Sequence, residues 1–211
     1  PLIAAVRMHS GAGTQTAGLS FGGFLPGGVT NNTEEYNGNG WSSSGDLGTS
    51  RYELAGCGTQ TAGLGFGGNA PPGILGVTEE YNGSTWSEQN DLGTARYGLS
   101  SSVGTYNTVL GCAGYKPSTV VANVEEYNGS GWSAGTNVNT ARNNLGGAGT
   151  STAGLVFGSA APLNRTEEWN GSAWSEQSDM STARHVYGGN AGTQTAALAV
   201  GGFVGTDTNA T

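Results

Sequence analysis

Charged side chains are scarce in this sequence, and positively charged ones are the scarcest. Seven of the 211 residues are Lys or Arg and 15 are Asp or Glu, which gives a formal net charge of −8. Nucleic acids and anionic membrane surfaces are bound through basic faces, so we expect no nucleic-acid partner. Apolar runs are also short, and none approaches the roughly 20 residues of a membrane helix. We therefore expect no membrane insertion.

Residues that hold metals or perform nucleophilic chemistry are few as well. The two histidines, His9 and His185, have no Cys pair or Asp-rich loop beside them, although zinc and calcium sites need such clusters. The two cysteines, Cys57 and Cys112, fall at different strand positions of neighbouring repeats, so we expect buried free thiols rather than a disulfide. The sequence predicts no metal, no cofactor and no enzymatic activity.

A sequence motif of the form Glu-Glu-aromatic-Asn-Gly, followed by Trp and then Arg, recurs through the chain. The tryptophans of its four copies are 45, 46 and 42 residues apart. A second motif, Gly-Thr, recurs with the same period and marks a fifth copy of the repeat. The unit is about 45 residues long, and fixed periods of this length indicate repeat architectures. We expect one domain, 1–211, with approximate repeats 8–51, 52–96, 97–142, 143–184 and 185–211.

Each unit contains four short segments with the character of strands. In the second copy they span 52–57, 61–66, 77–82 and 85–89. Bulky and small residues alternate in them, which is typical of β-strands, and Asn-Gly between the third and fourth predicts a tight hairpin. Forty glycines and a charged fraction of 10% argue against helices. The fold class predicted is all-β, a propeller of four-stranded antiparallel blades.

The repeats resemble kelch motifs. Each copy has a Gly-Gly doublet after its second strand, a Tyr in the third, a Trp about five residues later and an Arg that opens the next unit. Departures are Ala113-Gly114 and Gly158-Ser159 at the doublet and Trp169 at the tyrosine. The repeats are also similar, more loosely, to those in tail or structural proteins of marine bacteriophages. These resemblances imply a kelch-like propeller and a protein of the virion surface.

The fifth copy ends at Thr211, just where its Glu-Glu-aromatic motif would begin. Two interpretations follow. Either five inner strand pairs close a five-bladed ring with one incomplete blade, or the chain is part of a longer array. We favour the five-bladed ring, because terminal repeats are commonly atypical.

The paired glutamates invite comparison with glycosidase carboxylates, but adjacent strand residues point to opposite faces and cannot act together. We expect one Glu of each pair to meet the recurrent Arg, and the tryptophans to pack between blades, although a sugar-stacking role for Trp is the alternative. The inter-blade residues predicted are Glu35, Glu80, Glu126, Glu168, Arg51, Arg96, Arg142, Arg184, Trp41, Trp86, Trp132 and Trp174.

The loops after the second strand of each unit vary in length and chemistry while the framework barely changes. In a propeller these loops emerge on one face, and binding sites commonly lie on loops held by a rigid scaffold. Sequence drift in unconstrained surface loops would explain the variation of these loops equally well. The ligand-binding residues predicted are Phe24, Leu25, Asn69, Ile74, Tyr115, Lys116, Asn164, Arg165 and Phe203.

Abundant Ser, Thr, Asn, Tyr and Trp with little charge suit neutral sugars. We expect a non-enzymatic, lectin-like module outside the cell or on a virion surface, which recognises glycans or a cell-surface receptor through one propeller face. The alternative is a structural or protein-docking propeller that contacts other virion or fibre proteins and has no small-molecule ligand.

Overall fold

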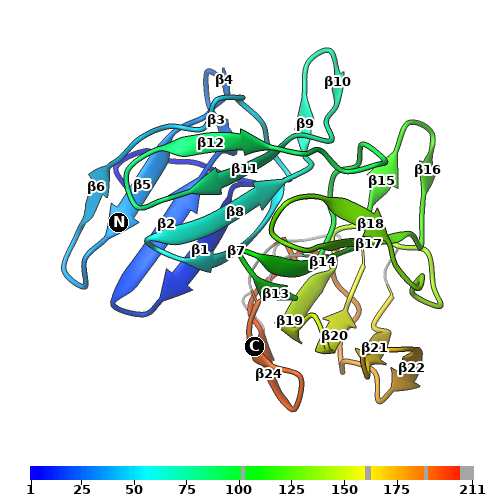
Figure 1. Cartoon of the computed structure of the whole chain (residues 1–211). Helices are drawn as coiled ribbons and strands as arrows, with labels where there is room; N and C mark the ends of the chain where they lie inside the picture. The colour runs from blue at the N-terminus through cyan, green and yellow to red at the C-terminus, as the bar shows by residue number, and fades with distance from the viewer. Residues whose placement is uncertain (101–102, 160–162, 188–189, 205–211) are drawn as a thin grey trace.

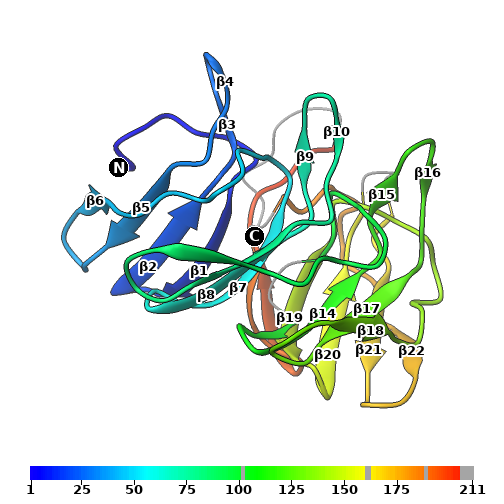
Figure 2. The ribbon, with the colours of Figure 1, turned by 45° about the horizontal axis from the view of Figure 1, so that its top comes forward.

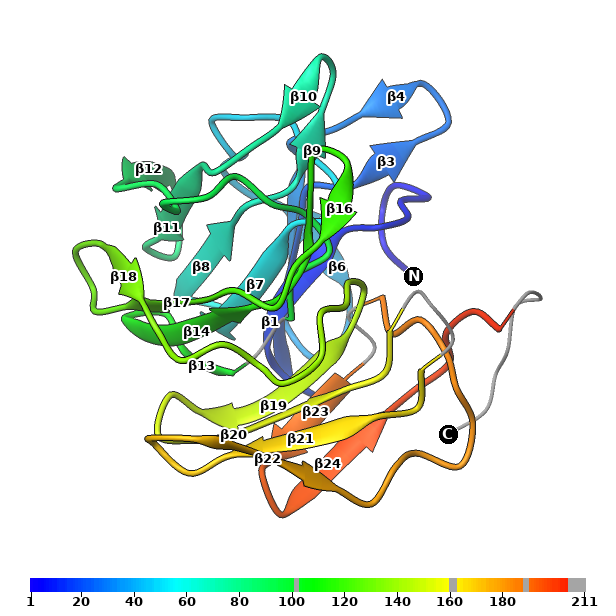
Figure 3. The ribbon, with the colours of Figure 1, turned by 90° about the vertical axis from the view of Figure 1, so that its right-hand side faces the viewer.

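The computed structural model describes residues 1–100, 103–159, 163–187 and 190–204 (Figure 1). Strands are the only regular elements of these residues, and no helix occurs among them. The strands form four-stranded antiparallel sheets arranged around a common centre (Figure 3). The prediction of an all-β propeller is confirmed.

Each blade is built from one repeat, and its strands follow one another from the centre outward. Blade 1 contains β1 (Ser10–Thr14), β2 (Ala17–Phe21), β5 (Thr33–Tyr36) and β6 (Trp41–Ser43). Blade 2 contains β7 (Ala55–Thr59), β8 (Ala62–Phe66), β11 (Thr78–Tyr81) and β12 (Trp86–Gln89). Blade 3 contains β13 (Gly104–Thr105), β14 (Thr108–Cys112), β17 (Val124–Tyr127) and β18 (Trp132–Ala134). Blade 4 contains β19 (Gly146–Thr150), β20 (Ala153–Phe157), β21 (Thr166–Trp169) and β22 (Trp174–Gln177).

The prediction of five blades is wrong, because the structure has four. In its described residues, the fifth repeat contributes only the two-stranded sheet of β23 (Asn190–Thr193) and β24 (Ala196–Ala199), which packs beside β19 of blade 4. Leu19 of β2 is 2% exposed because blade 2 covers it, whereas the equivalent Leu198 is 53% exposed. No described blade therefore covers the far side of this hairpin, which in the described residues lacks the third and fourth strands of a blade.

Glycine lets neighbouring blades approach closely. The Phe21 ring of blade 1 lies so near β7 that a Cβ on Gly56 would overlap it, and a Cβ on Gly65 of β8 would lie 3.1 Å from the same ring. Leu19 approaches Gly63 in the same way. Bulky residues on one blade thus fill the space left by glycines on the next, and the core consists of these contacts.

A buried arginine anchors the chain where it enters a new blade. The Arg51 guanidinium is fully buried and donates to Gly65 O at 3.3 Å, to Gly67 O at 3.1 Å and to the Glu79 carboxylate at 3.1 Å. The other Glu79 oxygen accepts the Gly48 backbone N–H at 2.6 Å. Arg96–Glu125 at 2.9 Å and Arg142–Glu167 at 2.8 Å repeat this ion pair. The arginine side chain therefore supplies buried hydrogen-bond donors to carbonyl groups of the second strand and of the loop that follows it.

The glutamate that meets arginine is the first of each pair, and this corrects the choice of the second. Glu35 and Glu80 instead accept hydrogen bonds from the tyrosines of the next blade, Tyr81 and Tyr127, the latter at 3.0 Å. Glu126 and Glu168 occupy the same strand position in blades 3 and 4. Glu35 and Glu80 therefore join their blades to the next one through phenol groups.

Blade 1 departs from the arginine pattern. Glu34 accepts the backbone N–H groups of Ile3 and Ala4 at 2.8 and 3.1 Å, as Glu79 accepts that of Gly48. This register places Val6, rather than Arg7, at the position of Arg51. Arg7 instead lies over the Phe24 ring, with its guanidinium carbon 5.1 Å from the ring centroid.

A series of backbone hydrogen bonds joins successive repeats at one end of the propeller. In each repeat the bonded residue lies shortly before the first strand, and its N–H donates to the carbonyl of the equivalent residue in the preceding repeat. The four bonds are Glu53 N to Met8 O at 2.9 Å, Gly98 N to Glu53 O at 3.0 Å, Asn144 N to Gly98 O at 2.7 Å, and Val186 N to Asn144 O at 2.8 Å. We call this run the axial chain.

Three tryptophans pack against the preceding blade, as predicted. Trp86 lies 4.8 Å from the Phe21 ring, centroid to centroid, and donates its Nε1–H to Thr33 Oγ1 at 3.0 Å. Trp132 makes the same contacts with Phe66 and Thr78, and Trp174 donates to the carbonyl of Thr136. Trp41 is different, since blade 1 has no described blade before it.

Candidate functional site: the central cavity

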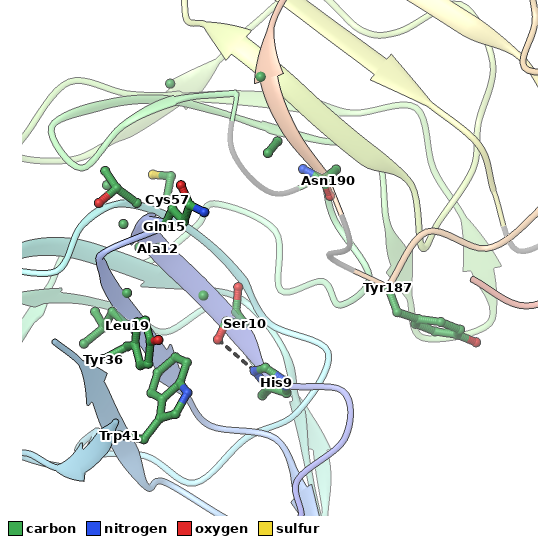
Figure 4. Close-up of a pocket in the computed structure, with 18 of the residues that line it drawn as sticks. His9, Ser10, Ala12, Gln15, Leu19, Tyr36, Trp41, Cys57, Tyr187 and Asn190 are labelled. Carbon is green, nitrogen blue, oxygen red and sulfur yellow. Dashed lines mark hydrogen bonds between the residues drawn. The ribbon is translucent and has the colours of Figure 1, made fainter. Parts of the chain in front are cut away.

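The inner strands surround a cavity of about 790 Å³, drawn in close-up in Figure 4. Its wall is formed by β1 and β23 together with glycines at the ends of β7, β13 and β19. Because Gly58, Gly104 and Gly149 carry no side chain, main-chain atoms line much of the interior. A volume of this size lies in the range of ligand pockets.

The side chains that line the cavity are mostly neutral and polar, and they come from two regions. Ser10 and Gln15 belong to the first hairpin of blade 1, and Asn190 opens β23 on the other side. Asn190 Nδ2 donates to Gly147 O at 2.5 Å, which orients its amide across the first strands. Hydroxyl and amide groups in this arrangement can form hydrogen bonds with a polar, uncharged ligand.

An aromatic pair lies along one wall. The rings of Tyr36 and Trp41 are 5.3 Å apart and inclined by 38°. The indole reaches over Gly18, where an added Cβ would lie 3.5 Å from its edge. Both rings are half-exposed, whereas the equivalent Tyr81 is 2% exposed under blade 1. Among the described residues, Trp41 thus has no counterpart of the ring contacts that Trp86 and Trp132 make with Phe21 and Phe66 of the preceding blade.

His9 lies at the end of the cavity near the axial chain. Its Nδ1 is 3.2 Å from Ser10 O and 3.0 Å from Ser20 Oγ. The imidazole is therefore held by blade 1 itself, and its ring contributes to the wall of the cavity.

Burial keeps the cysteine of the cavity protonated. Cys57 is free, and desolvation raises the pKa of its thiol to about 12. Its Sγ–H donates to Thr105 O at 3.3 Å. Since the thiolate is the nucleophile and the metal ligand, this thiol is unreactive at neutral pH.

One carboxyl group lies beside the cavity, at the axial chain. Burial raises the pKa of Glu53, and a hydrogen bond with the Asn144 side chain opposes the rise. Glu53 and Tyr187 border a small recess of about 30 Å³. Among the described residues, no three His, Cys, Asp or Glu side chains gather as a metal site would require.

Six of the nine ligand-binding residues predicted from the sequence lie on small hairpins away from this cavity, and Asn164, Arg165 and Phe203 lie outside those hairpins. Three small hairpins project from the same side of the propeller (Figure 2). They are β3 (Phe24–Leu25) with β4 (Gly28–Val29), β9 (Asn69–Ala70) with β10 (Gly73–Ile74), and β15 (Tyr115–Lys116) with β16 (Thr119–Val120). The loops therefore do share one face, but none of the nine predicted residues lines the central cavity.

Six of these nine residues are engaged in contacts with the propeller, and three of the six, Phe24, Asn69 and Tyr115, belong to the hairpins. Ring contacts hold Phe24 against Tyr52 at 5.6 Å, Tyr115 against Tyr97 at 5.2 Å and Phe203 against His185 at 5.4 Å, all between centroids. Asn69, Asn164 and Arg165 are also engaged: Asn69 donates to the Tyr52 hydroxyl, Asn164 to Met180 O, and Arg165 to Glu176. Leu25, Ile74 and Lys116 are half-buried.

Sequence reasoning missed Ser10, Gln15, Tyr36 and Asn190. A signal was available for Asn190, because it replaces the small residues that start the first strand elsewhere: Gly11, Gly56 and Gly147 hold the equivalent place. Tyr36 gave no such signal, because it stands in the same sequence motif as the buried Tyr81. The two residues differ only in that no described blade precedes blade 1.

No helix in the described part of the chain is long and apolar enough to span a membrane. No protein-family model and no curated protein matches this sequence. The β-propeller arrangement is accordingly established by the strands and their pairing, and the function has to be argued from the cavity and the surface.

Proposed function

We propose that the protein is a non-enzymatic binding module that recognises neutral glycans, with the central cavity as its principal site. The observation that carries the proposal is the half-exposed pair of Tyr36 and Trp41 on one wall, with the amide of Gln15 in the lining of the same cavity. An indole ring suits the apolar face of a pyranose, and amides and hydroxyls suit its hydroxyl groups.

The charge of the lining supports the same ligand class. The described lining residues include no Asp, Glu, Lys or Arg, and His9 is the one imidazole among them. A phosphorylated or sulfated ligand would leave its charge without a cationic partner, at a large desolvation cost. A neutral sugar avoids this cost.

The resemblance of the repeats to kelch motifs and to bacteriophage tail repeats supports a place outside the cell or on a virion surface. The partner would then be a cell-surface glycan or a glycosylated receptor. The small hairpins on one face extend the accessible surface around the propeller and offer a secondary contact area.

A glycan array with fluorescently labelled protein tests the proposal. We expect binding to a class of neutral glycans, reduced at least tenfold in Trp41→Ala because the stacking surface is lost. Lys116→Ala, on hairpin β15–β16, is the matched control and should bind like the wild type. Circular dichroism confirms that each variant is folded.

Two results would contradict this assignment. Loss of binding in Lys116→Ala but not in Trp41→Ala would move the site to the hairpins. If a folded, monodisperse protein binds no glycan on the array, the result would favour the second candidate, a structural or protein-docking propeller. That candidate is supported by the apolar side chains exposed on and after β24, Leu198 and Val200.

A further inference from the structure

The hairpin β23–β24 binds blade 4 as a complete blade would. Gln194 Nε2 donates to Gly154 O at 3.2 Å and to Trp169 O at 2.6 Å. Gln60 of blade 2 makes the same two contacts with blade 1, to Gly18 O and Tyr36 O. The inner half of a fifth blade is therefore correctly seated, and its outer edge is β24.

In the four complete blades the strand equivalent to β24 pairs with a Thr/Val-Glu-Glu-aromatic strand in one register. Leu19 lies opposite Glu35, Leu64 opposite Glu80, Leu110 opposite Glu126 and Leu155 opposite Glu168. The pairing of β23 with β24 aligns Leu198 with Leu155 and Ala197 with Gly154. An incoming strand in this register would place its second Glu opposite Leu198 and its aromatic residue opposite Ala197.

A crevice of about 290 Å³ beside β24 corresponds to a tryptophan site. It is lined by Phe157 and Thr166 of blade 4 and by Gln194 and Ala197 of the hairpin. Phe157 and Thr166 hold the positions of Phe21 and Thr33, which receive the Trp86 ring and its Nε1–H in blade 1. No described tryptophan occupies the crevice.

A third contact is also in place on blade 4. Glu35 and Glu80 each accept a hydrogen bond from the tyrosine on the third strand of the next blade. Glu168 is the equivalent residue of blade 4 and is half-buried. A tyrosine on a strand added to β24 would be placed to donate to it.

We propose that β24 and this crevice form a docking site for an outer β-hairpin of the repeat's own type, Thr-Glu-Glu-Tyr-Asn-Gly-x-x-Trp. The added strand pairs with the free edge of β24 and its Trp fills the crevice. Exposed strand edges are templates for this kind of addition.

The test uses a fluorescein-labelled peptide with residues 78–89 of this chain, which contain both strands of such a hairpin. Fluorescence anisotropy with the whole protein should show saturable binding, and hydrogen exchange should show new protection at 196–199. The peptide with Trp86→Ala should bind at least tenfold more weakly, because the crevice stays unfilled.

Charge changes at Leu198 test the register, and its exposure makes them compatible with folding. Leu198→Glu places a carboxylate opposite Glu80 of the peptide and should weaken binding about tenfold, since like charges directly opposite repel. Leu198→Lys should bind as well as the wild type or better.

Three outcomes would overturn the proposal. The first is no saturable binding up to millimolar peptide, and the second is equal binding of the Trp86→Ala peptide or no protection at 196–199. The third is a dimer of the protein itself, seen by sedimentation velocity and not dispersed by the peptide, which would make a second copy the occupant of the edge. The glycan result is independent, because the two sites share no lining residues.

Discussion

At the scale of single residues, the recurrent arginine and glutamate form three buried ion pairs whose removal is costly. Arg51 is fully buried, and desolvation lowers its pKa to about 10 even though Glu79 opposes the shift. A buried charge with a partner is tolerated, whereas one that has lost its partner is strongly destabilising.

Glu79→Gln should therefore lower the free energy of unfolding by about 3 kcal/mol, because the Arg51 charge stays buried without its counter-charge. Glu34→Gln in blade 1 is the matched control. It should cost less, at most about 1 kcal/mol, since Glu34 accepts two backbone N–H groups and the residue at the arginine position is Val6. Urea unfolding measures both, and equal losses would contradict this account of the pair.

Tyr81 makes stability depend on pH in the alkaline range. Burial, and then its hydrogen bond to Glu35, raises the pKa of Tyr81 to about 12 from the ordinary 10. The folded state thus holds the proton more tightly than the unfolded state. This stabilisation is complete below about pH 10 and is lost as pH rises through 12.

The free energy of unfolding should accordingly fall between pH 10 and 12, and Tyr81→Phe should flatten that fall. Burial raises the pKa values of the Cys57 and Cys112 thiols to about 12, so these groups also lower the free energy of unfolding as the pH rises above 9. Tyr106→Phe, at a 37% exposed tyrosine, is the control and should leave the profile unchanged. Urea midpoints at pH 8, 10 and 11 make the comparison, and identical slopes for Tyr81→Phe and wild type would disprove the assignment.

At the scale of elements, the inner strands depend on glycine for the approach of the next blade. At Gly56 an added Cβ would overlap the Phe21 ring and lie 2.7 Å from Ser10 Oγ. At Gly73, on hairpin β9–β10, it would meet nothing within 4 Å.

Gly56→Ala should cost roughly 1–3 kcal/mol, as overpacking of a close-packed interface does. Gly73→Ala should change stability by less than about 0.5 kcal/mol. Thermal unfolding of the two variants provides the comparison, and equal melting temperatures would show that the blades can move apart at little cost.

The elements also show what sequence could predict. In blade 2 the predicted segments 61–66, 77–82 and 85–89 agree with β8, β11 and β12 within a residue at each end, because alternation and the Asn-Gly turn fix them locally. The first strand begins at Ala55 rather than residue 52, since Glu53 adopts a φ of 51° in the axial chain. Alternation also shows that Glu79 and Glu80 face opposite ways, but not which of them faces Arg51.

At the scale of the whole molecule, the number of blades and the central cavity were out of reach of the sequence. The period counts five copies, but a blade needs four strands, and the fifth copy has two in the described residues. The cavity depends on where the first and last repeats come to lie, and Trp41 lines it only because blade 1 has no described blade before it.

Stability should be uneven around the propeller for the same reason. Backbone amides of β23–β24 should exchange at least about tenfold faster than those of β7–β8, because β24 has a free edge and an exposed apolar face. Hydrogen exchange followed by mass spectrometry compares the two hairpins, which have the same position in their repeats. Equal protection would mean that blade 4 alone holds β23–β24 as firmly as a complete blade would.

The axial chain has a consequence for how such a protein can change over time. Its links are main-chain N–H and C=O groups, so Met8, Glu53, Gly98, Asn144 and Val186 do the same task with five unrelated side chains. A contact of this kind needs no matched pair of mutations when a repeat is duplicated or replaced. Copies can therefore diverge in the cavity and on the hairpins while the joint between neighbours is inherited intact.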